Sequence, residues 1–345
     1  MDAAVPSDRE ILDRVSRSFA LTIRALPRRL RAPVEIAYLL ARAADTVADR
    51  DLVPPDRRRA SLAALRRAVA AAAEAGRRRA DEAALAALDV AADGGPADAV
   101  DAAERALLDR LGVVLARLGA LPPADRADAA WIVETLAATM DRELAFFGAG
   151  AAALRALPDG AALEAYTEGI AGCVGEFWTR LVARKAPRLA PRALWLSRAG
   201  RRYGRGLQLV NVLRDLPRDL RRGRCFLPEA DLAAAGLAPA DLLDPGAAPR
   251  LLPVLQKWER IARLDLLAGL QYAAALPVPA WRLRFASVLP ARIGVLTLRA
   301  LAEAPPAARL DPARSIKVPR RAVRAAAFSA ALLCLVPRGP LRLPD

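Results

Sequence analysis

The stretch at residues 206–219 reads Gly-Leu-Gln-Leu-Val-Asn-Val-Leu-Arg-Asp-Leu-Pro-Arg-Asp. Four of its polar side chains recur at i, i+3, i+7 and i+11, which is the spacing of one face of an α-helix. They are Gln208, Asn211, Asp215 and Asp219. Most other positions are apolar, as in a helix that packs within a core. A polar face on such a helix costs free energy unless it is paired or functional, so the stretch predicts a helical fold with a site on this helix.

An earlier aspartate pair, Asp45 and Asp49, has the same four-residue spacing as Asp215 and Asp219. On a helix this spacing puts both carboxylates on one face, about one turn apart. Hard divalent cations such as Mg²⁺ bind carboxylate and phosphate oxygens, so two such pairs facing each other could hold a metal–diphosphate cluster. Charged residues make up 26% of the chain. A single pair of this kind is therefore more often a solvated helix face, and the surroundings must decide.

Composition favours helix throughout the chain. It has 345 residues, of which 54% are hydrophobic and 5% aromatic, and alanine, leucine and arginine dominate. These residues lose little side-chain freedom in a helix, whereas strands favour branched and aromatic residues. No alternating strand pattern is evident, and the Pro- and Gly-rich residues 223–253 predict mostly loop. We expect one helical domain over residues 1–345. Helices are expected at Ser7–Arg24, from about Pro33 to Asp49, and at Ala60–Ala92, Asp98–Leu118, Pro123–Phe147, Leu163–Arg184, Pro191–Leu213, Leu255–Ala275, Trp281–Ala304 and Arg320–Leu335.

Several classes of function are excluded or disfavoured. The chain contains no histidine, which excludes histidine bases, Ser-His triads and histidine metal sites. The formal charge of +15 has no accompanying nucleic-acid module, and fits a phosphate-rich ligand or an anionic membrane better. Scattered Cys173, Cys225 and Cys334 indicate a reducing, cytoplasmic compartment. Residues 1–9 lack the apolar region of a signal peptide, and residues 325–336 form an apolar run too short to cross a bilayer.

Five motifs, in order, resemble those of the squalene/phytoene synthase family. They are Ser-Arg-Ser-Phe at 16–19, Arg-x-x-Asp-Thr-Val-x-Asp at 42–49, Tyr-x-x-x-x-Ala-Gly-x-Val-Gly at 166–175, Leu-Gln-x-x-Asn-x-x-Arg-Asp-x-x-x-Asp at 207–219 and Gly-Arg-x-Phe-x-Pro at 223–228. They extend from about Ser16 to Arg321. Within the family, residues 289–300 and 316–318 resemble the squalene synthase branch most closely.

The resemblance implies an all-α isoprenoid synthase fold, a helical bundle around a deep apolar channel with the aspartate pairs at its mouth. It implies that Mg²⁺, or Mn²⁺ in its place, is bound by Asp45, Asp49, Asp215 and Asp219. Tyr166 resembles the family tyrosine near the diphosphate and the departing proton, although a core tyrosine bonded to a carbonyl is an equal alternative. Substrate or diphosphate contacts are expected from Ser16, Arg17, Ser18, Phe19, Arg42, Gln208, Asn211, Arg214 and Arg224. Contacts to NADPH are expected from Arg17, Arg42, Arg214 and Lys317.

The implied reaction joins two farnesyl diphosphates head to head to presqualene diphosphate, which NADPH then reduces to squalene. The same condensation could instead end at presqualene diphosphate, hydroxysqualene, dehydrosqualene or phytoene. A third reading, from another class, is a non-catalytic helical assembly or binding protein. We expect a monomer that does not bind nucleic acid; its apolar substrate and product are compatible with peripheral membrane association.

The sequence departs from the family pattern at several positions. Ala48 and Arg218 stand where squalene synthases commonly have an acid just before the second aspartate of each motif. Pro217 lies inside the second motif and is expected to kink or loosen the turn there. Pro319 stands where the squalene branch often has a basic residue, which affects the reductive step. Gly172 and Gly175 mark close approach of a helix either to a prenyl chain or to a neighbouring helix.

Overall fold

Helices account for nearly all of the described chain, and the predicted all-α class is confirmed. The computed structural model describes residues 23, 26–50, 53–75, 102–148, 154–314 and 316–335. The chain forms two compact units, the first made of Met1–Ala149 with Arg180–Lys185 and the second of Gly150–Thr179 with Ala186–Asp345. The single domain and the deep apolar channel expected from the resemblance stay predictions. The helix expected at Ser7–Arg24 falls almost entirely outside the described residues.

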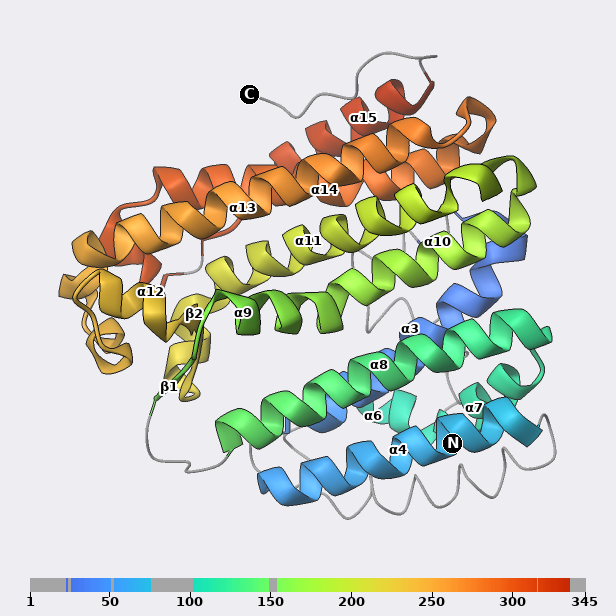
Figure 1. The fold of residues 1–345 in the computed structure, drawn as a ribbon, viewed down its shortest axis with the longest axis horizontal. Helices are drawn as coiled ribbons and strands as arrows, with labels where there is room; N and C mark the ends of the chain where they lie inside the picture. Colours follow the sequence, from blue (N-terminus) through green and yellow to red (C-terminus); the bar gives the residue numbers. More distant parts are fainter. Residues whose placement is uncertain are drawn as a thin grey trace, which may run out of the picture. The chain divides into compact units, whose positions relative to one another are not determined.

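The first unit is a bundle of helices, coloured blue to green in Figure 1. Its helices are α3 (Arg28–Ala48), α4 (Pro55–Ala75), α6 (Ala102–Asp109), α7 (Leu111–Gly119) and α8 (Pro123–Gly148). Helix α3 has the apolar stripe that its sequence predicts, and Leu39, Leu40 and Ala43 are fully buried. This stripe packs against α8, and α4 packs on α8 as well. The polar end of α3 that carries Asp45 is thereby held on a rigid core.

Charged residues from α10 complete this unit. Asp125, at the start of α8, accepts hydrogen bonds from Arg184 Nη1 and Lys185 Nζ, both at 2.6 Å. Asp128 accepts a further bond from Arg184. The Asp125 side chain is only 3% exposed, so its charge is compensated by two cations in a largely dry position.

The second unit is built on long helices (Figure 1). Its main elements are β1 (Arg155–Leu157), α9 (Gly160–Thr167), the π-helical turn η3 (Glu168–Gly172), α10 (Cys173–Lys185, whose last six residues belong to the first unit), α11 (Ala193–Arg221), β2 (Arg224–Pro228), α12 (Glu229–Ala234), α13 (Ala248–Ala275), α14 (Trp281–Glu303) and α15 (Arg320–Leu335). Short 3₁₀ turns η4 (Pro187–Arg192), η5 (Pro239–Leu243), η6 (Pro245–Ala247), η7 (Val278–Ala280) and η8 (Pro306–Arg309) connect them. Helix α11 packs on α13, α13 on α14, and α14 on α15.

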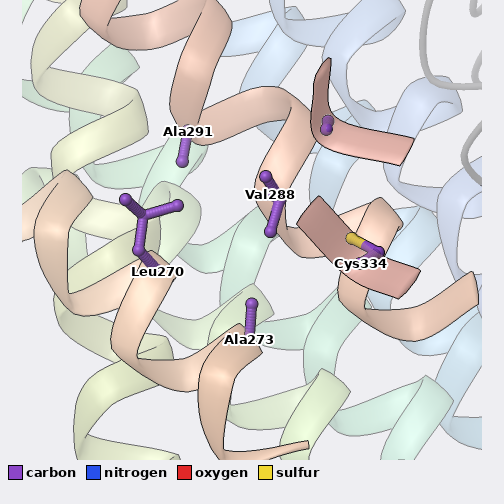
Figure 2. Close-up of a cluster of buried hydrophobic side chains, with 6 residues drawn as sticks. Leu270, Ala273, Val288, Ala291 and Cys334 are labelled. Atoms are coloured by element: carbon purple, nitrogen blue, oxygen red, sulfur yellow. The ribbon is translucent and has the colours of Figure 1, made fainter. Parts of the chain in front are cut away.

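Small side chains let α13, α14 and α15 approach closely. Figure 2 shows Leu270 and Ala273 of α13 gathered with Val288 and Ala291 of α14 and with Cys334 of α15. None of these side chains is more than 2% exposed.

All three cysteines are free and buried. Burial raises the pKa of Cys173 and of Cys225 to about 12. Their thiols are therefore protonated and unreactive in the folded protein.

Glycines bring η3 and α10 against α11. A Cβ at Gly175 would overlap the backbone carbonyl of Gly200, and one at Gly204 would overlap that of Ala171. At Gly172 the nearest atoms belong to the Glu168 side chain. Of the two interpretations left open for Gly175, the structure therefore supports helix packing.

Four details correct the sequence predictions. Short parallel strands β1 and β2 pair, with Arg155 opposite Arg224 and Ala156 opposite Cys225, although no strand was expected. The region expected to be loop contains β2, α12 and the start of α13, which begins seven residues earlier than predicted. The expected helix at Asp98–Leu118 is divided at Arg110 into α6 and α7. Finally, the helix expected to end at Leu213 is α11, which continues through Pro217 to Arg221.

Within the described residues, one stretch is long and apolar enough to span a membrane, residues 278–303 with a mean hydropathy of 1.4. Half of its most apolar window is buried inside the structure. A core helix has the same composition, and here the stretch is α14, packed between α13 and α15.

Candidate active site

The first aspartate pair lies at the C-terminal end of α3. Asp45 is in the last turn, and Asp49 follows the helix, donating its backbone N–H to the Asp45 carbonyl at 2.9 Å. The Arg42 guanidinium bonds both Asp45, one turn away, and Glu104 of α6. We call Arg42, Asp45, Asp49 and Glu104 the Asp45 cluster.

The electrostatics of the Asp45 cluster favour a cation. The pKa of Asp45 is raised to about 6, first by burial and then by the charge of Asp49, against the opposing effect of Arg42. Glu104 adds a further negative charge to the same group. Three carboxylates share one arginine, so negative charge is in excess in a half-buried position, with the Asp45 side chain 38% exposed. A divalent cation would relieve this excess, and the oxygen donors present suit Mg²⁺.

The second pair lies on α11, within the helix predicted from residues 206–219. Arg214 binds Asp215 in a bidentate pair, with Nε donating at 2.9 Å and Nη2 at 2.6 Å. The pKa of Asp219 is raised to about 6, first by burial, while Arg224 opposes the shift and Asp215 adds to it. Asp215 and Asp219 thus also offer oxygen donors, one of them held at a desolvation cost, which again suits a divalent cation.

Three arginines surround Asp219 and modify its charge. Arg224 has the largest effect, and Arg218 and Arg222 also lower the Asp219 pKa. Arg218 stands where the family pattern commonly has an acid, so this chain replaces a negative charge with a positive one. The positive φ of 72° at Gly223 ends α11 and turns the chain into β2, which places Arg224 next to the helix end.

A hydrogen-bonded row extends from α11 to α9. Asn211 Nδ2 donates to Gln208 Oε1 at 3.2 Å, and Gln208 Nε2 donates to the Tyr166 hydroxyl at 3.4 Å. The Tyr166 ring stacks on Phe226 of β2, with centroids 4.5 Å apart and planes 25° from parallel. The tyrosine is fixed by its ring and its hydroxyl is held by the polar face of α11, next to the π-helical turn η3. Such turns are frequent at functional sites.

Most of these residues stand out in the sequence, but the roles of Phe226 and Glu104 do not. Phe226 stands in the quoted 223–228 motif, yet its role emerges only when β2 brings it against Tyr166. Glu104 has no sequence signal, because it reaches Arg42 across 62 positions through helix packing.

The remaining predicted site residues are distributed as follows. Ser16, Arg17, Ser18 and Phe19 lie outside the described residues. Lys317 is exposed in the segment that precedes α15. Ala48 is buried at the last turn of α3, where its carbonyl accepts a bond from Arg58 Nη1 at 2.9 Å.

In the described parts of the chain, no three cysteine or carboxylate side chains form a group that would hold a metal ion on protein ligands alone. The two pairs belong to different units, so each is a half-site described by itself. Mg²⁺ commonly binds through one or two carboxylates together with substrate phosphates, and each half-site offers such a pair.

Comparisons with known proteins agree with these features. The family model described as squalene/phytoene synthase matches residues 12–322. A presqualene diphosphate synthase from Zymomonas mobilis is 36% identical over 94 residues, which are 27% of this chain and 30% of that protein. Across the curated relatives, the matched stretch spans between 9% and 45% of their length.

Two solved structures share the fold. A complex of TcSQS with a ligand has a TM-score of 0.73 at 23% identity, over 95% of this chain and 88% of that one. A dehydrosqualene synthase in complex with a ligand has a TM-score of 0.63 at 18% identity, over 94% of both chains. With the five ordered motifs and a model match over most of its length, the chain belongs to the squalene/phytoene synthase family.

Proposed function

We propose that the chain is a Mg²⁺-dependent prenyltransferase that condenses two farnesyl diphosphates head to head. In this proposal the first product is presqualene diphosphate, which is then reduced to squalene with NADPH. The observation that carries the proposal is that an aspartate pair of the same spacing lies at the end of α3 and again on α11, each with an arginine bound to its first aspartate. Keeping such a pair charged costs desolvation free energy, which the Mg²⁺ of a metal-bound diphosphate would offset.

The metal would be held by Asp45 and Asp49 in one half-site and by Asp215 and Asp219 in the other. Bound Mg²⁺, or Mn²⁺, supplies Lewis-acid neutralisation of the diphosphate, which makes it a better leaving group. Arg42 and Arg214 each pair with the first aspartate of their own motif, so each keeps a guanidinium next to the place where phosphate oxygens are expected.

In the condensation, the C1–O bond of the donor breaks and the donor's diphosphate leaves. The double bond of the acceptor supplies the electron pair for the new C–C bond, and loss of a proton closes the cyclopropane of presqualene diphosphate. Tyr166 is the residue we assign to this proton, because its hydroxyl is held by Gln208 and its ring by Phe226. A hydroxyl fixed in this way can pass a proton toward the departing diphosphate.

The reductive step has weaker support from the described residues. Arg42 and Arg214 have their guanidinium groups on carboxylates, and Lys317 is exposed in a separate segment. The support for the reduction is the resemblance of residues 289–300 and 316–318 to the squalene synthase branch.

The deciding experiment incubates the purified protein with farnesyl diphosphate and Mg²⁺, with and without NADPH, and identifies the products by mass spectrometry. Squalene formed only with NADPH supports both steps. Presqualene diphosphate, hydroxysqualene or dehydrosqualene under both conditions supports the condensation and removes the reduction. A parallel incubation with geranylgeranyl diphosphate tests for phytoene, and absence of any condensed product would favour a non-catalytic helical protein.

Two variants make the metal assignment specific. Asp215→Asn is expected to lower turnover by at least about 100-fold, because it removes a charged oxygen donor. Asp141→Asn, which alters a surface carboxylate paired with Arg59 at 2.7 Å, serves as the matched control and should leave turnover unchanged. Equal activity of the two variants would contradict the assignment. We further propose that the protein acts as a monomer in the cytoplasm, which light scattering and cell fractionation test.

A further inference from the structure

Helix α15 turns its largest apolar side chains outward. Phe328 and Leu332 are 69% and 52% exposed, whereas Ala326, Ala330 and Cys334 are at most 4% exposed. The two sets are offset by two residues, so they lie on opposite sides of the helix. A helix that only covers a protein core has the reverse arrangement, with large apolar residues inside. Small residues on the inner side allow α15 to pack closely on α14 (Figure 2) and leave Phe328 and Leu332 outside.

The same outward side is strongly basic near its start. Arg320 and Arg324 precede Phe328 and Leu332 at four-residue intervals, and Arg321 lies beside them. All three arginines are exposed. Helix α15 contains no aspartate or glutamate. The outward side therefore changes from cationic to apolar along one helix, without acids that would neutralise it.

We propose that Arg320, Arg321, Arg324, Phe328 and Leu332, the α15 face, dock the protein on an anionic lipid surface. Guanidinium groups pair with lipid phosphates, while phenyl and isobutyl groups enter the boundary between headgroups and acyl chains. The 16 residues of α15 extend about 24 Å, less than the ~30 Å hydrocarbon core, so the helix lies in the plane of the surface. The formal charge of +15 favours the same partner.

The neighbouring end of α14 extends this surface. Arg284 Nη1 donates to the carbonyl of Cys334 at 3.4 Å, so the start of α14 lies beside the end of α15. Trp281 is one turn before Arg284 and is 41% exposed. Tryptophan is enriched at the membrane–water boundary, where its ring spans the apolar and polar layers. Trp281 therefore adds an aromatic side chain near the apolar end of the α15 face.

The test uses the full-length protein and sedimentation with vesicles of phosphatidylcholine, alone or with about 30% phosphatidylglycerol. We expect binding to the anionic vesicles only, weakened by salt. Replacing the three arginines (R320Q/R321Q/R324Q) should lower the partition coefficient by on the order of 100-fold, about fivefold per charge. Phe328→Ser with Leu332→Ser should weaken binding at high salt more than at low salt, because it removes the apolar part alone.

The chain offers a matched control in Leu194 and Trp195. These residues of α11 are 68% and 46% exposed and lie near Arg192 and Arg198, so they form a comparable surface elsewhere in the second unit. Leu194→Ser with Trp195→Ser should bind vesicles like the wild type. Far-ultraviolet circular dichroism and melting temperature check that each variant is folded.

Three outcomes would overturn the proposal. The first is loss of binding in the Leu194 and Trp195 control while the α15 variants still bind. The second is protein that stays on the vesicles in high salt and in alkaline carbonate, which would indicate that residues 278–303 span the bilayer. The third is a change in oligomer mass, without a change in vesicle binding, when Phe328 and Leu332 are replaced, which would assign the face to a second copy of the chain. None of these readouts depends on the proposed reaction.

Discussion

Asp45 holds a charge that its surroundings disfavour. Its pKa is raised to about 6 from the ordinary 3.8, so the folded state binds this proton more tightly than the unfolded state. The free energy of unfolding attributable to this group therefore falls as the pH rises from about 4 to about 6, and stays low above that range. We expect Asp45→Asn, which cannot ionise, to melt at a higher temperature than the wild type at pH 7.5 without metal.

Thermal melts of both proteins from pH 4 to pH 8 in EDTA check this. The advantage of Asp45→Asn should shrink toward pH 4, where the wild-type carboxyl is protonated in the folded state and partly protonated in the unfolded state. Asp141→Asn, the surface control, should show no such pH dependence. A lower melting temperature for Asp45→Asn at pH 7.5 would mean that its bond to Arg42 outweighs burial and the charge of Asp49.

Tyr166 is predicted to act through its hydroxyl group. Tyr166→Phe keeps the stack on Phe226 and removes the oxygen that Gln208 bonds. We expect kcat to fall by about 10²–10⁴, the usual contribution of a positioned proton donor or acceptor, with little change in melting temperature. Tyr203→Phe reverses the pattern, because that hydroxyl donates to the Ser287 carbonyl at 2.7 Å within the fold. It should lower stability and leave kcat unchanged.

At the scale of elements, side-chain periodicity was sufficient to predict the helices but not the short segments between them. The residues of α15 were predicted to the residue, and α11 was recognised from its polar face. Strands β1 and β2 could not be predicted, because three- and five-residue segments carry too few side chains to show alternation. The end of α11 was misplaced for a different reason. The helix was expected to end at Leu213, but burial of Leu216, Pro217 and Leu220 holds it as far as Arg221 against the local preference of proline.

The site divides in a similar way. Residues that act through their own helix, such as Asp215 and Gln208, follow from spacing. Those that act across elements, such as Glu104 and Phe226, require the packed structure. The resemblance to a family supplied roles that neither spacing nor packing provides.

The contact of η3 with α11 should be intolerant of any side chain. Gly204→Ala places a methyl group on the Ala171 carbonyl, and we expect a loss of about 1–3 kcal/mol in the free energy of unfolding, as for other overpacked sites. Gly160→Ala is the matched control, because its new methyl group would meet Trp258 at an ordinary 3.5 Å. Urea denaturation of both variants measures the difference. Equal stabilities would show that the two helices can separate without cost.

At the scale of the whole molecule, α10 contributes residues to both units, and its last residues are fixed in the first unit by Asp125. Asp125→Asn weakens the bonds to Arg184 and Lys185, so trypsin should cleave after these residues about tenfold faster, the effect of ~1.4 kcal/mol of local stability. Limited proteolysis with mass spectrometry checks the positions and rates. Unchanged rates at both sites, with Asp141→Asn as the reference, would contradict this role.

The absence of histidine simplifies the pH profile of the proposed enzyme. Asp45 and Asp219, both with a pKa of about 6, are the described groups expected to titrate near neutrality. We expect kcat/KM at low Mg²⁺ to rise with pH through a midpoint near 6, because protons and metal compete for these carboxylates. Raising the Mg²⁺ concentration should move the midpoint to lower pH. A midpoint that does not change with the Mg²⁺ concentration would contradict the assignment of these aspartates as metal ligands.

The three buried cysteines of the second unit can report how often the elements around them open. Cys173 lies in α10, Cys225 in β2 and Cys334 in α15, and each thiol can be alkylated only when its own element opens. The order in which the three are labelled in native buffer therefore ranks the local opening rates of three different elements. If the α15 face binds lipid, anionic vesicles should lower the alkylation rate of Cys334 and leave that of Cys225 unchanged.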